Sequence, residues 1–208
     1  MKEKKTGTWK IWVVTIFLFA VVVAATIRVS TLPVLNFTAK GSKVHIVIDP
    51  GHGGFDPGKV GTMGTLEKDV NLNISLKLRE ILTKSGYTVA MTREKDEALC
   101  GETTGKKKVE DLNARLAVID KEKPELTVSI HQNSYSAGTK GAQVFYYSGS
   151  EEGKRLANVL QETIKEEMGD GNHRVEKAND SYYMLKKSSG PFVIIECGFL
   201  SNEAETTR

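Results

Sequence analysis

The stretch VHIVIDPGHGG, residues 44–54, joins a short apolar run to a glycine-rich turn. Its β-branched residues predict a strand that is buried on both faces, and the sequence Asp49-Pro50-Gly51 predicts where this strand ends. Strands without a polar face are typical of parallel sheets that helices cover on both sides. This first strand therefore indicates an α/β fold, in which His52 follows directly after the strand.

Strand and helix patterns alternate along the chain after this turn. Apolar residues at spacings of three and four predict a helix over 66–81, and the Ser85-Gly86 pair ends it. Ser148 lies three residues before Glu151 and predicts a capping box at the start of a later helix. The alternation predicts one α/β domain with a mostly parallel open sheet flanked by helices. The remaining elements are expected as strands over 87–91, 126–130, 142–147 and 192–196 and as a helix from about residue 109.

The N-terminal part consists of a basic segment and an uncharged segment. Residues 1–10 contain four lysines, and residues 11–27 contain no charged side chain. As a helix the uncharged run would span roughly 26 Å, so we expect a transmembrane anchor there, with a cleaved signal peptide or a buried core helix as alternatives. The lysines place residues 1–10 in the cytoplasm and the rest of the chain outside it. A linker over 28–42 then leads to a folded domain over 43–208.

The folded part has almost no net charge. Five of the 29 basic residues and one of the 26 acidic residues lie in the first 28 positions, which leaves 24 basic and 25 acidic residues. A nucleic-acid binder would carry a basic excess on its folded surface, so we expect no nucleic-acid partner. Cys100 and Cys197 lack the paired spacing of a zinc ribbon or a redox motif, and a disulfide between them is left open.

Two histidines and a glutamate lie where parallel strands are expected to end. His52 follows the first strand, Glu67 begins the next helix, and His131 follows the third strand. Because the carboxyl ends of parallel strands meet at one edge of a sheet, we expect the three side chains to converge. Two imidazoles and a carboxylate around an open position form the ligand set of a hydrolytic zinc site. The alternative is that both histidines are ordinary hydrogen-bonded residues and that Glu67 only favours its helix terminus.

Two further polar residues are expected near the same edge. Glu196 ends the apolar run over 192–195, and a buried carboxylate there needs a partner or a function. A glutamate that does not bind the zinc is the usual group that accepts a proton from water, whereas an ion pair with Arg93 or Arg115 is the alternative. Asn133 is expected either to orient a substrate or to cap a turn.

Four blocks of sequence, in a fixed order, carry a family resemblance. They are IDPGHGG at 48–54, LEKD at 66–69, SIHQN at 129–133 and IECGFLSN at 195–202, and MTR at 91–93 and DLNAR at 111–115 agree as well. Together they resemble the zinc-dependent N-acetylmuramoyl-L-alanine amidases of the type-3 amidase family. Within that family the chain looks most like the membrane-anchored spore cortex amidases, in which a short anchor precedes a bare catalytic domain.

The resemblance implies a reaction and a role for each site residue. It implies Zn²⁺ held by His52, Glu67 and His131, with Glu196 as the catalytic residue. The expected reaction is hydrolysis of the amide between the lactyl group of N-acetylmuramic acid and L-alanine of the peptidoglycan stem peptide. Asn133 and Arg93 are weaker candidates for substrate binding.

The resemblance also implies a biological setting. We expect an extracytoplasmic enzyme, held at the membrane by its anchor, that acts in spore cortex maturation through muramic lactam formation and in germination. The need for an activating protein partner is left open. Family domains continue past the last block through a further helix, so the domain over 43–208 is expected to lack it. The alternatives are a wall-binding module without activity and a zinc peptidase that cuts within the stem peptide.

Overall fold

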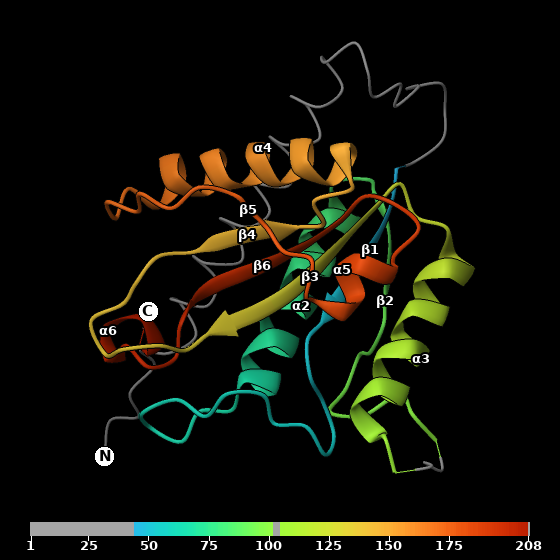
Figure 1. Cartoon of the computed structure of the whole chain (residues 1–208), viewed down its shortest axis with the longest axis horizontal. Coiled ribbons are helices and arrows are strands. Elements are labelled where there is room, and N and C mark those ends of the chain that lie inside the picture. The colour runs from blue at the N-terminus through green and yellow to red at the C-terminus, as the bar shows by residue number, and fades with distance from the viewer. Residues whose placement is uncertain (1–43, 102–104, 208) are drawn as a thin grey trace.

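A six-stranded sheet forms the centre of the protein, and helices cover both of its faces (Figure 1). The computed structural model describes residues 44–101 and 105–207. The strand order across the sheet is β2-β1-β3-β6-β4-β5. The strands are β1 (His45–Pro50), β2 (Thr88–Met91), β3 (Leu126–Asn133), β4 (Gln143–Tyr146), β5 (Lys177–Ala178) and β6 (Phe192–Phe199).

The sheet is mostly parallel, as the sequence predicts. β2, β1, β3 and β6 run parallel to one another, whereas β4 pairs antiparallel with β6. In the register of β3 and β6, His131 lies opposite Glu196. The carboxyl ends of β1, β3 and β6 therefore meet at one edge of the sheet.

Two pairs of helices cover the two faces. α2 (Glu67–Lys84) and α4 (Glu151–Met168) pack on one face, and α3 (Lys107–Glu122) and α5 (Tyr183–Lys187) pack on the other. Because side chains alternate along a strand, Ile46 and Ile48 of β1 join the first core and Val47 joins the second. All three side chains are fully buried, and each such burial stabilises the fold by about 1.5–3 kcal/mol.

The start of α4 corrects one local prediction. The helix begins at Glu151, and its N-cap is Ser150, whose Oγ accepts a hydrogen bond from the Gly153 backbone N–H. Ser148 lies outside the helix, and its backbone N–H donates to Asp180. The predicted capping box was therefore wrong, because the N-cap lies two residues later and the third helical residue, Gly153, has no side chain to complete a box.

Several elements were not predicted, and several predictions fall outside the structure. The sequence indicated neither α5 nor β5, nor the short helix α6 (Glu203–Thr206). The predicted segments 1–10, 11–27 and 28–42 lie outside the described residues. Within residues 44–101 and 105–207, no helix is both long and apolar enough to cross a membrane. Cys100 and Cys197 are both free thiols.

Candidate metal centre and active site

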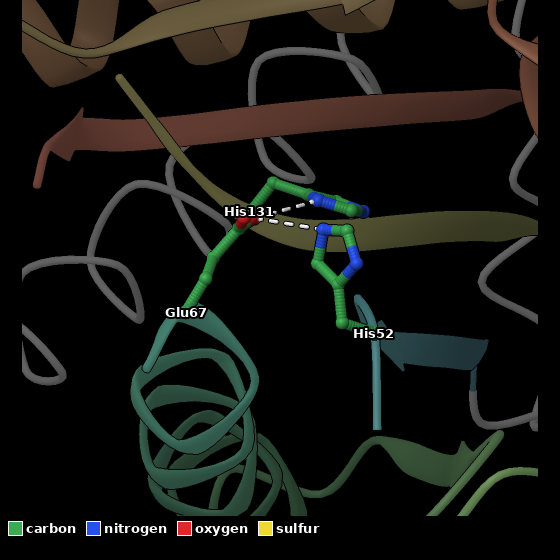
Figure 2. A group of neighbouring side chains, drawn as sticks. All are labelled: His52, Glu67 and His131. Carbon is green, nitrogen blue, oxygen red and sulfur yellow. Dashed lines mark hydrogen bonds and ion pairs between the residues drawn. The ribbon is translucent and has the colours of Figure 1, made fainter. Parts of the chain in front are cut away.

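Three potential metal ligands come together at the carboxyl edge of the sheet. His52 lies in the turn after β1, Glu67 is the first residue of α2, and His131 lies in β3. Their candidate ligand atoms all lie within 4.8 Å of one another. Figure 2 shows both imidazoles turned toward the Glu67 carboxylate, whose Oε1 lies 3.2 Å from His52 Nε2 and 3.0 Å from His131 Nδ1. The structure thus places the three residues together, and their binding of a metal stays a prediction.

The spacing and chemistry of these atoms fit a zinc ion. Ligand atoms at about 2.0–2.1 Å from a tetrahedral zinc lie roughly 3.3 Å from each other, close to the two separations observed. Glu67 is buried, and its carboxylate also accepts hydrogen bonds from the backbone N–H groups of Lys59 and Gln132. Burial alone would raise the pKa of Glu67, but hydrogen bonds and charges from His131 and His52 outweigh it and lower the pKa well below its usual range. Glu67 is therefore held as a carboxylate, the form that binds metal.

Two glycines leave the space that the ligands occupy. A Cβ added at Gly51 would overlap the His131 ring, and a Cβ at Gly58 would lie 2.6 Å from Glu67 Oε2. His52 itself has a left-handed backbone with φ of 62°, which is uncommon for a residue other than glycine. This conformation turns the chain sharply after β1 and points the His52 ring toward Glu67.

Two buried arginines hold this turn in place. Arg93 donates hydrogen bonds to the carbonyl oxygens of Pro50 and Gly51, and Arg115 donates to those of Pro50 and His52. Arg93 also donates to the carbonyls of Lys95 and Lys68, so four of its five N–H donors are occupied by backbone. The Arg93 side chain is buried beneath the turn and lies outside the cavity lining, so the prediction that it binds substrate has no support in this arrangement.

Arg115 also forms a buried network of charges. Its guanidinium lies 2.9 Å from Asp49 Oδ1 and 2.7 Å from Asp111 Oδ2. The Asp49 carboxylate further accepts hydrogen bonds from the Thr92 and Ser129 hydroxyls. Burial would raise the pKa of Asp49, but the Arg115 charge and these two hydrogen bonds hold it below its usual range. The network ties β1 and β3 to α3 directly beneath the site.

Glu196 lies on β6 beside His131 and is bound quite differently. Its side chain is buried, and Oε2 has no hydrogen-bond partner among the described residues. Burial raises the pKa of Glu196 above its ordinary value, although the neighbouring His131 charge partly offsets this effect. In residues 44–101 and 105–207 it forms no ion pair with Arg93 or Arg115, because both guanidiniums are bound to the turn after β1. The ion-pair alternative for Glu196 is therefore wrong.

A cavity of about 510 Å³ connects the cluster to Glu196. Asn133 lines it, although its Oδ1 accepts a hydrogen bond from the Ser134 backbone N–H, as a turn-capping residue would. The lining also includes Tyr182 and Tyr183 of the α5 region. Other lining residues not singled out from the sequence are Asp56, Lys59, Lys108, Leu112 and Met184.

The family comparison agrees with this arrangement. The family model described as N-acetylmuramoyl-L-alanine amidase (Amidase_3) matches residues 46–208. The germination-specific N-acetylmuramoyl-L-alanine amidase of Bacillus subtilis (strain 168) is 37% identical over 166 residues, which make up 78% of this chain and 69% of that relative.

Solved structures give the same family. The CwlD amidase from Clostridioides difficile, in complex with the GerS lipoprotein, matches with a TM-score of 0.75 and 41% identity over 79% of this chain and 86% of that one. The N-acetylmuramoyl-L-alanine amidase AmiC2 of Nostoc punctiforme matches with a TM-score of 0.66 and 32% identity over 79% of this chain and 84% of that one. With the family model spanning all of the described domain from β1 onward, this chain belongs to the Amidase_3 family of N-acetylmuramoyl-L-alanine amidases.

Proposed function

We propose that this protein is a zinc-dependent enzyme that hydrolyses the amide between the lactyl group of N-acetylmuramic acid and L-alanine of the stem peptide. The observation that carries the proposal is the cavity itself, where a His-Glu-His cluster lies beside a buried glutamate, one oxygen of which has no hydrogen-bond partner in the described part of the chain. A cluster of metal-ligating residues and a poised carboxylate in one cavity is the arrangement expected of metal-assisted hydrolysis. Membership of the N-acetylmuramoyl-L-alanine amidase family supports the choice of this amide as the bond that is hydrolysed.

The protein side chains divide into those that would hold the ion and those that would react. His52, Glu67 and His131 would hold the ion. Zinc bound there would supply a Lewis acid at the scissile carbonyl and lower the pKa of water toward about 7. Since three protein ligands are available, a fourth position is left for the reaction, as in catalytic zinc sites.

Glu196 would move the proton. Its buried carboxylate accepts a proton from the attacking water and then returns that proton to the nitrogen of L-alanine as the C–N bond breaks. The raised pKa of Glu196, caused first by burial, favours this role because it brings proton affinity closer to neutral pH. One residue thereby serves as base and acid in turn.

The proposed setting is the spore cortex. Similarity to a germination-specific amidase supports a role in cortex maturation, through muramic lactam formation, and in germination. The uncharged run over 11–27 supports an extracytoplasmic enzyme anchored in the membrane. Likeness to an amidase solved with a lipoprotein supports an activating protein partner.

Mass spectrometry of digested peptidoglycan tests the proposed reaction. The full-length chain in mild detergent is incubated with purified peptidoglycan, once with added zinc and once with a chelator. We expect stem peptides with a free L-alanine amino terminus to appear only with zinc. Cleavage at a bond within the stem peptide would instead identify a peptidase.

A result without any cleavage is resolved by measuring the metal content. Absence of both release and bound zinc would contradict the enzyme assignment and favour a wall-binding module. Zinc bound in equal amount to protein, again without release, is followed by a repeat with a candidate lipoprotein partner, and continued inactivity then contradicts the proposal.

A further inference from the structure

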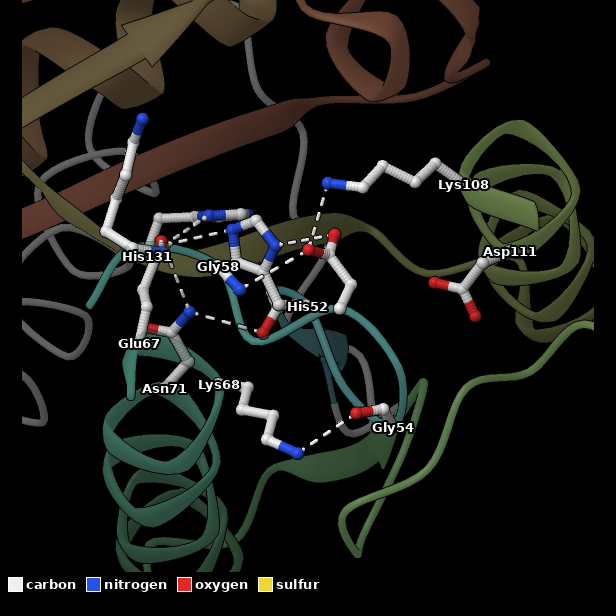
Figure 3. Close-up of polar contacts among 12 residues, drawn as sticks. His52, Gly54, Gly58, Glu67, Lys68, Asn71, Lys108, Asp111 and His131 are labelled. Carbon is white, nitrogen blue, oxygen red and sulfur yellow. Dashed lines mark hydrogen bonds and ion pairs between the residues drawn. The ribbon is translucent and has the colours of Figure 1, made fainter. Parts of the chain in front are cut away.

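Asp56 contacts the outer nitrogen of His52. Asp56 Oδ2 lies 3.0 Å from His52 Nδ1, on the side of the ring away from Glu67. The same carboxylate is bound through Oδ1 by Lys108 Nζ at 3.0 Å and by the Gly58 backbone N–H at 3.3 Å. Figure 3 shows His52 between these contacts and the Glu67 carboxylate. The imidazole is therefore held at both nitrogens by carboxylates.

The two histidines of the cluster are fixed in different ways. His131 presents Nδ1 to Glu67, and its Nε2 has no hydrogen bond among the described residues. Its ring is instead fixed by packing, against Gly51 and edge-on to the His52 ring at a centroid distance of 5.0 Å. His52 is also packed, because a Cβ added at Gly58 would lie 2.7 Å from its Cδ2, but its second ring nitrogen contacts a carboxylate as well. The hydrogen bond to Asp56 is thus a constraint on the His52 ring that the His131 ring lacks.

We propose that Asp56 is a positioning residue that holds the proton of neutral His52 on Nδ1 and so leaves the Nε2 lone pair free for metal. A neutral imidazole has one N–H donor and one acceptor nitrogen, and the hydrogen bond made by one nitrogen decides the state of the other. Carboxylates placed in this way raise ligand basicity, and their loss typically costs 10- to 100-fold in metal affinity. This inference rests on the proposed zinc function.

The position of Asp56 depends more on its own turn than on the ion pair with Lys108. The Asp56 side chain is only 17% exposed, whereas that of Lys108 is 70% exposed. An ion pair with so exposed a partner contributes at most about 1 kcal/mol. We therefore assign the position of Asp56 mainly to its own turn, in which Gly53 and Asp56 exchange two backbone hydrogen bonds.

Zinc affinity gives the first test. Competition between the full-length protein and a chromogenic chelator is measured for the original chain, Asp56→Ala and Asp56→Asn. We expect Asp56→Ala to weaken zinc binding about 10- to 100-fold. Asp56→Asn should lose less, because its amide oxygen can still accept the Nδ1–H hydrogen bond.

Asp96→Ala is the matched control. Asp96 also binds the same turn, through the Gly54 backbone N–H at 2.7 Å, and pairs with Lys68 at 2.6 Å, but it does not touch a histidine. We expect its zinc affinity to stay within about threefold of the original. Equal losses in Asp56→Ala and Asp96→Ala would overturn the proposal, because they would trace the effect to the loop as a whole.

The tautomer of His52 gives a second test that needs neither zinc nor activity. Long-range ¹H–¹⁵N spectra of zinc-free protein at about pH 9 report which ring nitrogen carries the proton. In zinc-free protein the Glu67 carboxylate also contacts Nε2, so we expect the share of the Nδ1–H tautomer to be largest in the original chain, smaller in Asp56→Asn and smallest in Asp56→Ala. An unchanged tautomer in Asp56→Ala contradicts the inference, whatever happens to activity. Failure of the original chain to bind zinc would contradict the proposed function and leave this measurement intact.

Discussion

The two sides of the cavity differ in how completely their polar groups are bound. In the turn after β1, each carbonyl from Pro50 to His52 accepts a hydrogen bond from a buried arginine. On β6, Glu196 is also buried, but one of its carboxylate oxygens has no hydrogen-bond partner among the described residues. The first side is stabilised by its contacts, whereas the second retains the free-energy cost of an unpaired buried group, about 1–3 kcal/mol.

This difference matches the two tasks of a hydrolytic site. Metal ligands must be held rigidly, and residues that fix their backbone do so without taking part in the reaction. A general base must instead be able to gain and lose a proton, so a full set of hydrogen bonds to its charged form would hinder it. We infer that stabilising contacts in this fold are concentrated beneath the proposed ligands and are fewer around Glu196.

Glu196→Gln tests the reactive side and should have the largest effect. The amide preserves shape but cannot accept the proton of water, so amidase activity should fall about 10²- to 10⁴-fold while zinc affinity stays nearly unchanged. Activity is measured as release of stem peptides and zinc by chelator competition. Glu203→Gln, an exposed carboxylate on α6, is the control and should keep full activity. Loss of zinc in Glu196→Gln would contradict the division between the two sides.

Arg115→Met tests the rigid side through stability. It removes the guanidinium that binds the carboxylates of Asp49 and Asp111, and leaves two buried charges unpaired. We expect a loss of about 3–5 kcal/mol in the free energy of unfolding, measured by denaturant titration of zinc-free protein.

Arg79→Met is the matched control for Arg115→Met. Arg79 also forms an ion pair, with Glu94 at 2.7 Å, but its side chain is 33% exposed and that of Glu94 is 64% exposed. Its loss should cost less than about 1 kcal/mol. Similar losses of unfolding free energy in both variants would show that the buried network beneath the turn stabilises the fold no more than an exposed ion pair does.

The sequence predicts the rigid side of the fold well where the signal is local or topological. The run at 44–48 is short, apolar and β-branched, the helix over 66–81 has a clear periodicity, and the structure confirms the two as β1 and α2. The convergence of His52, Glu67 and His131 follows from parallel strands alone, because no side-chain contact has to be known to place strand ends at one edge.

The remaining features depend on contacts or backbone conformations that the local sequence does not reveal. Arg93 lies 42 residues from Gly51 in sequence, and nothing in its neighbours indicates that backbone carbonyls take up its donors. The contact of Asp56 with His52 depends on the left-handed backbone at His52, which residue preferences disfavour. The stretch over 182–185 could have been assigned to a groove, but an aromatic and apolar stretch is more often core, and only the structure shows Tyr182 and Tyr183 in the cavity lining.

Gly51→Ala probes the contact between the rigid turn and His131, a proposed metal ligand. The new methyl group would overlap the His131 ring, which would have to leave its position beside Glu67. Overpacking of this kind typically costs about 1–3 kcal/mol, and we expect weaker zinc binding of the same order. Gly138→Ala is the control because no atom lies within 4 Å of the added Cβ. Unchanged zinc affinity in Gly51→Ala would show that His131 can bind metal from another orientation.

The smallest expected effect is a difference in how stability depends on pH. Burial raises the pKa of Glu196 in the folded state above the ordinary value of 4.5. At a pH between 4.5 and this folded-state pKa, the folded state therefore binds more protons than the unfolded state. Folding stability contributed by protonated Glu196 is therefore lost as the pH rises through its folded pKa. Glu196→Gln lacks this loss. In zinc-free protein, the free energy of unfolding of Glu196→Gln relative to that of the original chain should therefore rise by about 1 kcal/mol as the pH approaches neutral.

Asp49 has a lowered pKa, so its contribution to stability is lost instead as the pH falls, and this loss is equal in both proteins. Parallel curves of unfolding free energy against pH for the two proteins would mean that the Glu196 carboxylate is as well bound as the turn after β1. The contrast between the two sides of the cavity would then not hold.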